Sequence, residues 1–193
     1  MALVDRARAI VTAPAATWPQ IAAEPDTPQR LFSQYVVPLA LISPVCSMLS
    51  YLIFLHRGIV VGLVVGVLGF GLELVYVAVV ALLAAALAPS FDGAPNRMQA
   101  LKWIAYSLTP RWLAGIALLV PIAGALITLV ASVFGLYLLY LGARPMMRVP
   151  QDKTVGYTAV LILCVIVLGA IIAAVIGAVV AALLVTAAVA LPH

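Results

Sequence analysis

The sequence has very little charge. Only 8% of its 193 residues are Asp, Glu, Lys or Arg, whereas 66% are hydrophobic. A soluble domain has about 25% charged residues, and a chain this poor in polar side chains cannot cover a surface that faces water. The composition excludes a soluble globular protein. It indicates an integral membrane protein that forms one bundle of helices.

The sequence also has few residues that could carry out chemistry. Its two cysteines, Cys46 and Cys164, lie within apolar runs, where free cysteine packs as a small hydrophobic side chain. The spacing of Cys46, Met48 and His56 matches no metal-ligand pattern. Neither His56 nor His193 has a serine or an acid at a spacing that would serve catalysis. We therefore expect no catalytic residue, no metal and no cofactor.

Five apolar runs predict five membrane-spanning helices. About 20 apolar residues in a helix cross the hydrocarbon core of a bilayer. Runs of this length or longer occupy 34–55, 59–87, 98–120, 121–142 and 155–191. Clusters of turn-forming residues separate these runs at 88–97 and 143–154, which we expect to be loops. We expect the long last run to be one tilted helix, and a hairpin of two short spans is the less favoured alternative.

The distribution of basic residues predicts the orientation. Ten Lys and Arg residues give the chain a net charge of +4, but no basic cluster interleaves with aromatic residues, so we expect no nucleic-acid partner. With the N-terminus inside, eight basic residues lie on the inner side and only Arg57 and Arg111 lie towards the outer side. The positive-inside rule then favours an all-α, five-span bundle with its N-terminus in the cytoplasm and its C-terminus outside.

Three of the inner basic residues follow the fourth span. Arg144, Arg148 and Lys153 lie beside a helix end, where they are expected either to contact anionic lipid headgroups or only to set the orientation. Lys102 lies near the inner end of the third span, from which a long side chain can extend to the membrane surface.

The N-terminal segment differs from the rest of the chain. We expect residues 1–33 to be a cytoplasmic amphipathic segment and residues 34–193 to be the membrane domain. Residues 2–11 predict a short helix able to lie on the inner leaflet. Its apolar face carries Leu3, Ala7 and Ile10.

A second short helix is expected after the first. Thr17 and Gln20 have the spacing of a helix-capping box, and Pro19 suits the first turn of a helix. Trp18 suits the level of the lipid headgroups. An ordinary cytoplasmic turn and helix fits these residues equally well.

Glu73 lies near the middle of the second span. An acid there costs about 2.5–3.5 kcal/mol on insertion scales. Gly62 and Gly66 lie on the same face of the helix as Glu73, and small residues four apart mark close helix packing. We therefore expect Glu73 to point into the bundle. In the last run, Gly169 and Gly177 belong to a similar repeat, which would pack on the second span or on a second protomer.

The third span contains the remaining intramembrane polar residues. Tyr106, Thr109 and Arg111 surround Pro110, which removes one backbone hydrogen bond and disfavours helix at Thr109. Arg111 would then bond the freed carbonyl groups or pair with Glu73. These four polar residues are interpreted as structural contacts within a kinked bundle. The alternative is an ion or proton path built on Glu73.

Several segments together resemble a known family. They are ALVDRARAIVTAPAATWPQIAAEP (2–25), YVVPLALI (35–42), FDGAPNRMQALKWIAYSLTP (91–110) and LYLLYLGARPMMRVPQDKTVGYT (136–158). In this order they resemble the Yip family of Ypt/Rab-interacting membrane proteins, in particular its small bacterial inner-membrane branch. The resemblance implies five spans and a cytoplasmic N-terminus, and it supplies no catalytic residue. A Rab partner is not expected, because the Asp-Leu-Tyr-Gly-Pro motif of eukaryotic relatives is missing.

Two functions follow from these observations. The favoured one is a non-enzymatic scaffold or adaptor of a bacterial inner (plasma) membrane, which contacts lipids, other membrane proteins or a second copy of itself. The alternative is a small transporter, channel or lipid translocator that uses Glu73. The chain has no repeat symmetry and no matching pair of interrupted helices, which disfavours a transporter.

Overall fold

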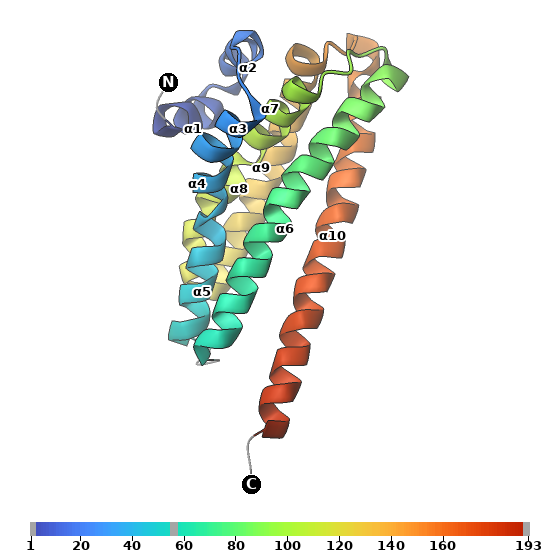
Figure 1. The fold of residues 1–193 in the computed structure, drawn as a ribbon. Coiled ribbons are helices and arrows are strands. Elements are labelled where there is room, and N and C mark those ends of the chain that lie inside the picture. The colour runs from blue at the N-terminus through green and yellow to red at the C-terminus, as the bar shows by residue number, and fades with distance from the viewer. Residues whose placement is uncertain (1–2, 55–57, 191–193) are drawn as a thin grey trace.

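The protein is almost entirely helical in the part of the chain that its computed structural model describes, residues 3–54 and 58–190, where no strand occurs (Figure 1). Most of these helices run side by side along the length of the molecule. His56, Arg57 and His193 lie outside the described residues. The elements, in chain order, are α1 (Leu3–Thr12), α2 (Pro14–Ala23), α3 (Pro28–Leu31), the π-helical turn η1 (Phe32–Val36), α4 (Val37–Ala40), α5 (Ile42–Phe54), α6 (Gly58–Leu87), the 3-10 helix η2 (Ala88–Phe91), α7 (Arg97–Ser107), α8 (Thr109–Ala114), the 3-10 helix η3 (Gly115–Leu119), α9 (Pro121–Met147) and α10 (Gln151–Ala190).

Four helical stretches are long and apolar enough to cross a membrane. They are Pro28–Ser50, Val61–Phe91, Ile122–Met147 and Gln151–Leu183. These stretches correspond to the first, second, fourth and fifth runs of the sequence. The molecule therefore has the helices of a multi-pass membrane protein.

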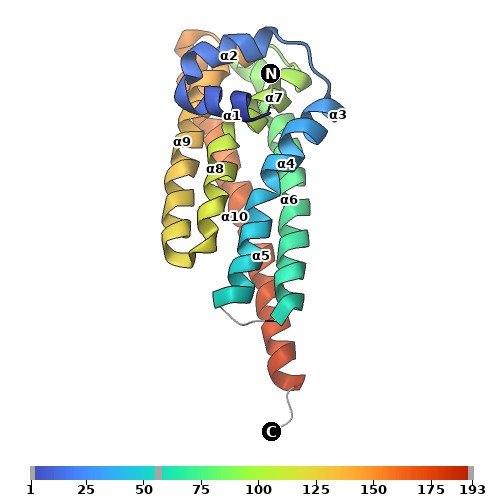
Figure 2. The ribbon, with the colours of Figure 1, turned by 90° about the vertical axis from the view of Figure 1, so that its left-hand side faces the viewer.

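The third predicted span is a broken helix. α7 ends at Ser107, α8 begins at Thr109, and η3 continues the chain from Gly115. Pro110 lies in the first turn of α8, where its missing N–H group costs no hydrogen bond. The short pieces together run beside α9 (Figure 2). No single helix of this segment has the length of a membrane crossing.

The last run forms one helix, as predicted, and not a hairpin. α10 extends over 40 residues, which at 1.5 Å per residue is about 60 Å. Its C-terminal part projects beyond the other helices (Figure 1). Most of that part therefore has no helix of this chain beside it.

The loop predicted over 143–154 is present only at residues 148–150. α9 continues through Pro145 to Met147, Arg148 ends it with a left-handed conformation (φ 54°), and α10 begins at Gln151. Met146 and Met147 are buried, so packing holds the last turn of α9 against the bundle in spite of the proline. The other predicted loop is a tight turn, in which Asp92 has a left-handed conformation (φ 56°) after η2.

The N-terminal helices pack on the bundle. α1 forms as predicted, and its residues Ala7 and Ile10 are buried against protein. Trp18 is only 1% exposed and packs beside Trp103, so it does not lie among headgroups. The predicted capping box is also wrong. Thr17 lies within α2, and its hydroxyl donates to Ala13 O at 2.8 Å.

The best-packed part of the core lies beneath α2. Trp103 and Tyr157 stack with ring centroids 5.6 Å apart. The Trp103 indole N–H donates to Leu139 O at 3.1 Å, and the Tyr157 hydroxyl donates to Ala84 O at 2.7 Å. These bonds join α6, α7, α9 and α10 at the end of the bundle that α1 and α2 cover. Four helices are therefore fixed to one another at this end of the bundle.

Candidate functional site

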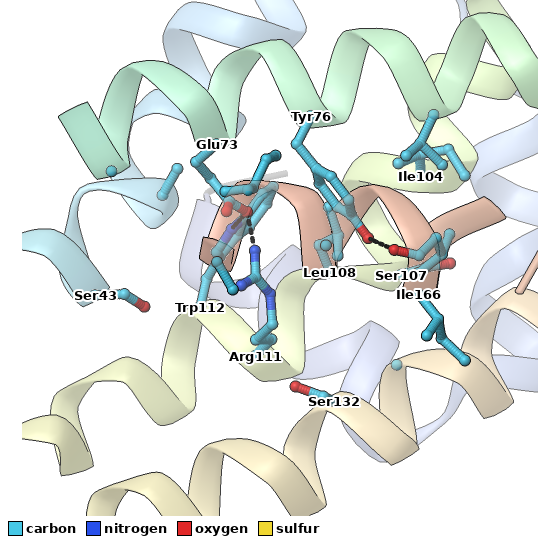
Figure 3. A pocket seen from close by; sticks show the side chains of 18 of the residues that line it. Ser43, Glu73, Tyr76, Ile104, Ser107, Leu108, Arg111, Trp112, Ser132 and Ile166 are labelled. Carbon is cyan, nitrogen blue, oxygen red and sulfur yellow. Dashed lines mark hydrogen bonds and ion pairs between the residues drawn. The ribbon is translucent and has the colours of Figure 1, made fainter. Parts of the chain in front are cut away.

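An ion pair joins α6 to α8 inside the bundle. Glu73, 15% exposed, pairs with the guanidinium of Arg111, 32% exposed (Figure 3). The indole N–H of Trp112 donates to the same carboxylate oxygen, Glu73 Oε1, at 2.8 Å. Arg111 and Trp112 are consecutive residues of α8, and both donate to Glu73. The cost of a carboxylate in the membrane interior is thereby offset by a counter-charge and a second hydrogen bond.

Tyr76 extends this set of contacts to α10. The Arg111 guanidinium carbon lies 6.0 Å from the centre of the Tyr76 ring, a distance at which a cation is attracted to an aromatic face. The Tyr76 hydroxyl donates to Val165 O at 3.3 Å. Three helices that are distant in the sequence are therefore linked through adjacent polar side chains.

The four predicted polar residues form two separate groups. Glu73 and Arg111 are together, but Tyr106 and Thr109 interact with Tyr35 instead. The Tyr35 and Thr109 hydroxyl oxygens lie 2.8 Å apart, and the Tyr35 and Tyr106 ring centres are separated by 4.5 Å. Tyr35 was not expected at this site, since nothing in the sequence indicates which residue of the first span faces α7.

Trp112 and Tyr76 were also missed. Each lies close in sequence to a predicted residue, Trp112 directly after Arg111 and Tyr76 one helical turn after Glu73. Lys102 differs from its prediction as well, because it does not extend to the membrane surface. It is buried, and its ammonium donates to Ile21 O at 2.7 Å and to Glu24 O at 2.9 Å.

A cavity of about 670 Å³ lies beside the ion pair (Figure 3). Residues of every long helix line it, and most of its wall is apolar. Its polar lining consists of Ser43, Ser47, Glu73, Tyr76, Ser107, Arg111, Trp112 and Ser132. On α9 and α10, the lining residues Leu129, Val133 and Ile166 are 62%, 61% and 55% exposed. The cavity is therefore open sideways between these two helices, towards the lipid of a surrounding membrane.

The glycines pack differently from the prediction. Gly62 and Gly66 of α6 lie against Met48 and Pro44 of α5. Gly169 and Gly177 of α10 have no atom within 4 Å of the position where a Cβ would be, so they do not pack on α6. The two small-residue faces are thus not partners of one another. The glycines of α6 instead pack against α5, the helix that precedes α6 in the sequence.

The comparison with protein families identifies the chain. The family model of the Yip1 domain matches residues 8–174. The chain belongs to the Yip1 domain family. No curated protein and no solved structure matches it.

The matched region of this Yip1 domain protein includes the candidate site. Glu73, Arg111 and Trp112 lie within it, as does every residue that lines the cavity except Ile176. It ends within α10, before the part of that helix that projects from the bundle. The ion pair and the cavity are therefore features of the Yip1 domain of this chain.

The end of α9 and the start of α10, which carry Arg144, Arg148 and Lys153, lie at the same end of the Yip1 domain as α1 and α2 (Figure 1). Lys153 forms an exposed ion pair with Asp92, whereas Arg144 and Arg148 are exposed at the end of α9. An exposed pair of this kind contributes little to stability, because solvent and salt screen the two charges. Of the three predicted headgroup ligands, Lys153 is thus already engaged with a carboxylate.

Proposed function

We propose that this Yip1 domain protein is a non-enzymatic adaptor of a bacterial inner membrane, which holds lipids or other membrane proteins against its spanning helices. The observation that carries this proposal is the state of Glu73. Its carboxylate accepts from both Arg111 and Trp112. An acid with two donors from another helix serves to connect helices, and a proton carrier would have to break both contacts in each cycle.

The outer face of α10 supports the same function. Ile171 and Val175, which do not line the cavity, are exposed, and a Cβ built at the neighbouring Gly177 would have no atom within 4 Å. Small residues on a spanning helix allow another helix or a lipid chain to approach its backbone closely. We propose that α10 is the helix on which a lipid, a membrane protein or a second copy binds.

The proposed orientation places the N-terminus in the cytoplasm and the C-terminus outside. The segments that carry most of the basic residues, namely α1 to α3, the α6–α7 connection and the α9–α10 connection, lie at one end of the bundle (Figures 1 and 2). Cytoplasmic loops of membrane proteins carry an excess of Lys and Arg. This clustering favours that end as the cytoplasmic one.

A transporter or lipid translocator is the second candidate. The cavity of about 670 Å³ beside Glu73 favours it, since a translocated molecule needs space within the bundle. Polar residues in a spanning segment often mark a transport path. Against it, Glu73 and Arg111 neutralise each other, and no further acid lines the cavity.

Flux measurements separate the two candidates. The full chain would be reconstituted in liposomes, and proton, potassium and lipid fluxes would be compared between the wild type and Glu73→Gln. For an adaptor we expect both proteins to match empty liposomes. Flux in the wild type that disappears in a folded Glu73→Gln protein would overturn the adaptor function.

A cross-linking experiment tests the adaptor directly. A photoreactive amino acid at the exposed position of Ile171 should form a discrete adduct in native membranes with a membrane protein or a second copy. The control is the same amino acid at Leu161, which is buried on the same helix. Equal yields from the two positions would contradict binding on the outer face of α10.

A further inference from the structure

The cavity has the dimensions and the access of a ligand site. Its volume of about 670 Å³ falls within the roughly 300–1,000 Å³ that is typical of small-molecule pockets. It opens between α9 and α10, where Leu129, Val133 and Ile166 are exposed. A molecule enters such an opening from the hydrocarbon core. The opening is therefore accessible to components of the membrane.

The polar lining favours an uncharged group on that ligand. Glu73 and Arg111 already neutralise each other, so the wall carries no net charge. Hydroxyl groups of Ser43, Ser47 and Ser132 lie on the wall as well. The buried hydroxyl of Ser107, also a lining residue, has no hydrogen-bond partner in the described part of the chain. These hydroxyl groups could hydrogen-bond to an uncharged oxygen of the ligand, such as a hydroxyl or a carbonyl.

The depth of the site excludes a phospholipid headgroup. Glu73 lies midway along α6, between its ends at Gly58 and Leu87. Phosphate groups lie at the membrane surface, about 15 Å from the centre of a hydrocarbon core that is roughly 30 Å thick. Moving a phosphate to this depth would leave its charge without a counter-charge, because Arg111 already has one in Glu73.

We propose that the cavity binds a neutral lipid, with its hydrocarbon chain between α9 and α10 and its hydroxyl or carbonyl head beside Ser107 and the Glu73–Arg111 pair. This inference rests on the adaptor function proposed above and specifies the class of lipid and its site. Diacylglycerols and isoprenoid quinones both have this chemistry. They combine long apolar chains with uncharged oxygen groups, and they lie within the hydrocarbon core.

Two matched pairs of glycine substitutions test the site. Gly169 of α10 lines the cavity, whereas Gly177 on the same helix does not, and neither has a neighbouring atom within 4 Å of a Cβ position. Gly169→Leu should fill the cavity, and Gly177→Leu is its control. On α6, Gly69 lines the cavity and meets only the end of Ile176 at 4.0 Å, while Gly71 is open and lies outside the lining. Gly69→Leu and Gly71→Leu form the second pair, which suffices if Gly169→Leu does not fold.

The assay uses the full chain in phosphatidylcholine vesicles with a diacylglycerol that carries a diazirine on one acyl chain. We expect saturable labelling that falls by about tenfold in Gly169→Leu and Gly69→Leu, equivalent to a loss of roughly 1.4 kcal/mol of binding free energy. Gly177→Leu and Gly71→Leu should be labelled like the wild type. Unlabelled diacylglycerol or an isoprenoid quinone should compete, and the better competitor identifies the natural source of the head group.

Two results would overturn the lipid site. One is equal labelling of the cavity-filling and control variants. The other is competition by phosphatidylglycerol as effective as that by diacylglycerol. The flux and labelling results are independent of each other. Flux that depends on Glu73 would overturn the adaptor function, but labelling that depends on Gly169 and Gly69 would still support the lipid site. Absence of flux, together with labelling that does not change in Gly169→Leu or Gly69→Leu, would overturn the lipid site alone.

Discussion

Arg111, the third residue of the short helix α8, forms an ion pair with Glu73 at the middle of α6. The two residues are 38 positions apart in the sequence, and they meet inside the bundle just after the helix break at Leu108. The pair and the neighbouring bond from Trp112 connect the broken segment to α6.

Two substitutions of Glu73 distinguish how much its charge and its hydrogen bonding each contribute to stability. Glu73→Leu leaves Arg111 without a partner in the membrane interior. Removing one member of a fully buried pair costs about 3–5 kcal/mol, and since Arg111 is 32% exposed we expect a loss of about 2 kcal/mol after discounting for that exposure. Glu73→Gln, which can still accept from Trp112, should lose less. Thermal unfolding in detergent measures the stability of both variants. Equal losses for Glu73→Leu and Glu73→Gln would contradict a stabilising hydrogen bond between residue 73 and Trp112.

The double variant Glu73→Leu/Arg111→Leu should recover most of the stability lost by Glu73→Leu alone. Replacing both members of a buried pair by apolar residues is often neutral, because no unpaired charge remains. Unfolding of the two single variants and the double variant gives the coupling energy of the pair. Losses that simply add would show that Glu73 and Arg111 act independently.

Gly142 should tolerate no side chain. A Cβ at this position would lie 2.5 Å from the Trp103 ring and 2.9 Å from the Trp18 ring. We expect Gly142→Ala to destabilise the protein by about 1–3 kcal/mol, as overpacked cores do. Gly71→Ala is the control, because its Cβ meets nothing within 4 Å and alanine favours helix by about 1 kcal/mol. A Gly142→Ala protein that melts at or above the wild-type temperature would refute this packing.

Lys102 should hold the N-terminal helices on the bundle. Its ammonium donates to Ile21 O and Glu24 O at the end of α2. Lys102→Met removes both bonds, each worth about 1.5–3 kcal/mol when a charged group takes part. We expect faster limited proteolysis between residues 24 and 27, which connect α2 to α3. Arg97→Met, the same change at an exposed position of α7, should leave the cleavage rate unchanged.

Cysteine labelling tests the topology. In a variant without Cys46 and Cys164, Arg148→Cys at the exposed α9–α10 connection should react with an impermeant reagent only from the cytoplasmic side. His193→Cys should react only from the outer side, because the proposed five crossings place the termini on opposite sides. Only α10 lies between the two positions, so labelling of both from the same side would rule out a single crossing by α10.

Several elements were predictable because their causes are local. The long apolar runs predicted α6, α9 and α10 as helices, and the absence of turn-forming residues in the last run predicted one helix. Pro110 predicted an interruption near Thr109, and the structure has it at Leu108. The midpoint position and shared helix face of Glu73 predicted an inward direction, and its carboxylate does lie inside the bundle.

Other features depended on partners from distant parts of the chain. Pro145 disfavours helix locally and so predicted a loop, but the burial of Met146 and Met147 keeps that segment helical. Lys102 has the sequence position of a residue that reaches the surface, yet α2 covers it and supplies two carbonyl groups. Gly169 and Gly62 have equivalent patterns, and only Gly62 packs against another helix of the chain.

The sequence by itself determined that this protein is helical, apolar and suited to a membrane. These properties follow from composition and run length, which act within each segment. Only the tertiary structure decided that Glu73 pairs with Arg111 and Trp112, that Tyr106 and Thr109 turn instead to Tyr35, and that a cavity remains beside the pair. Which helix faces lie together depends on packing among all the helices, and the spacing of residues within one helix does not contain that information.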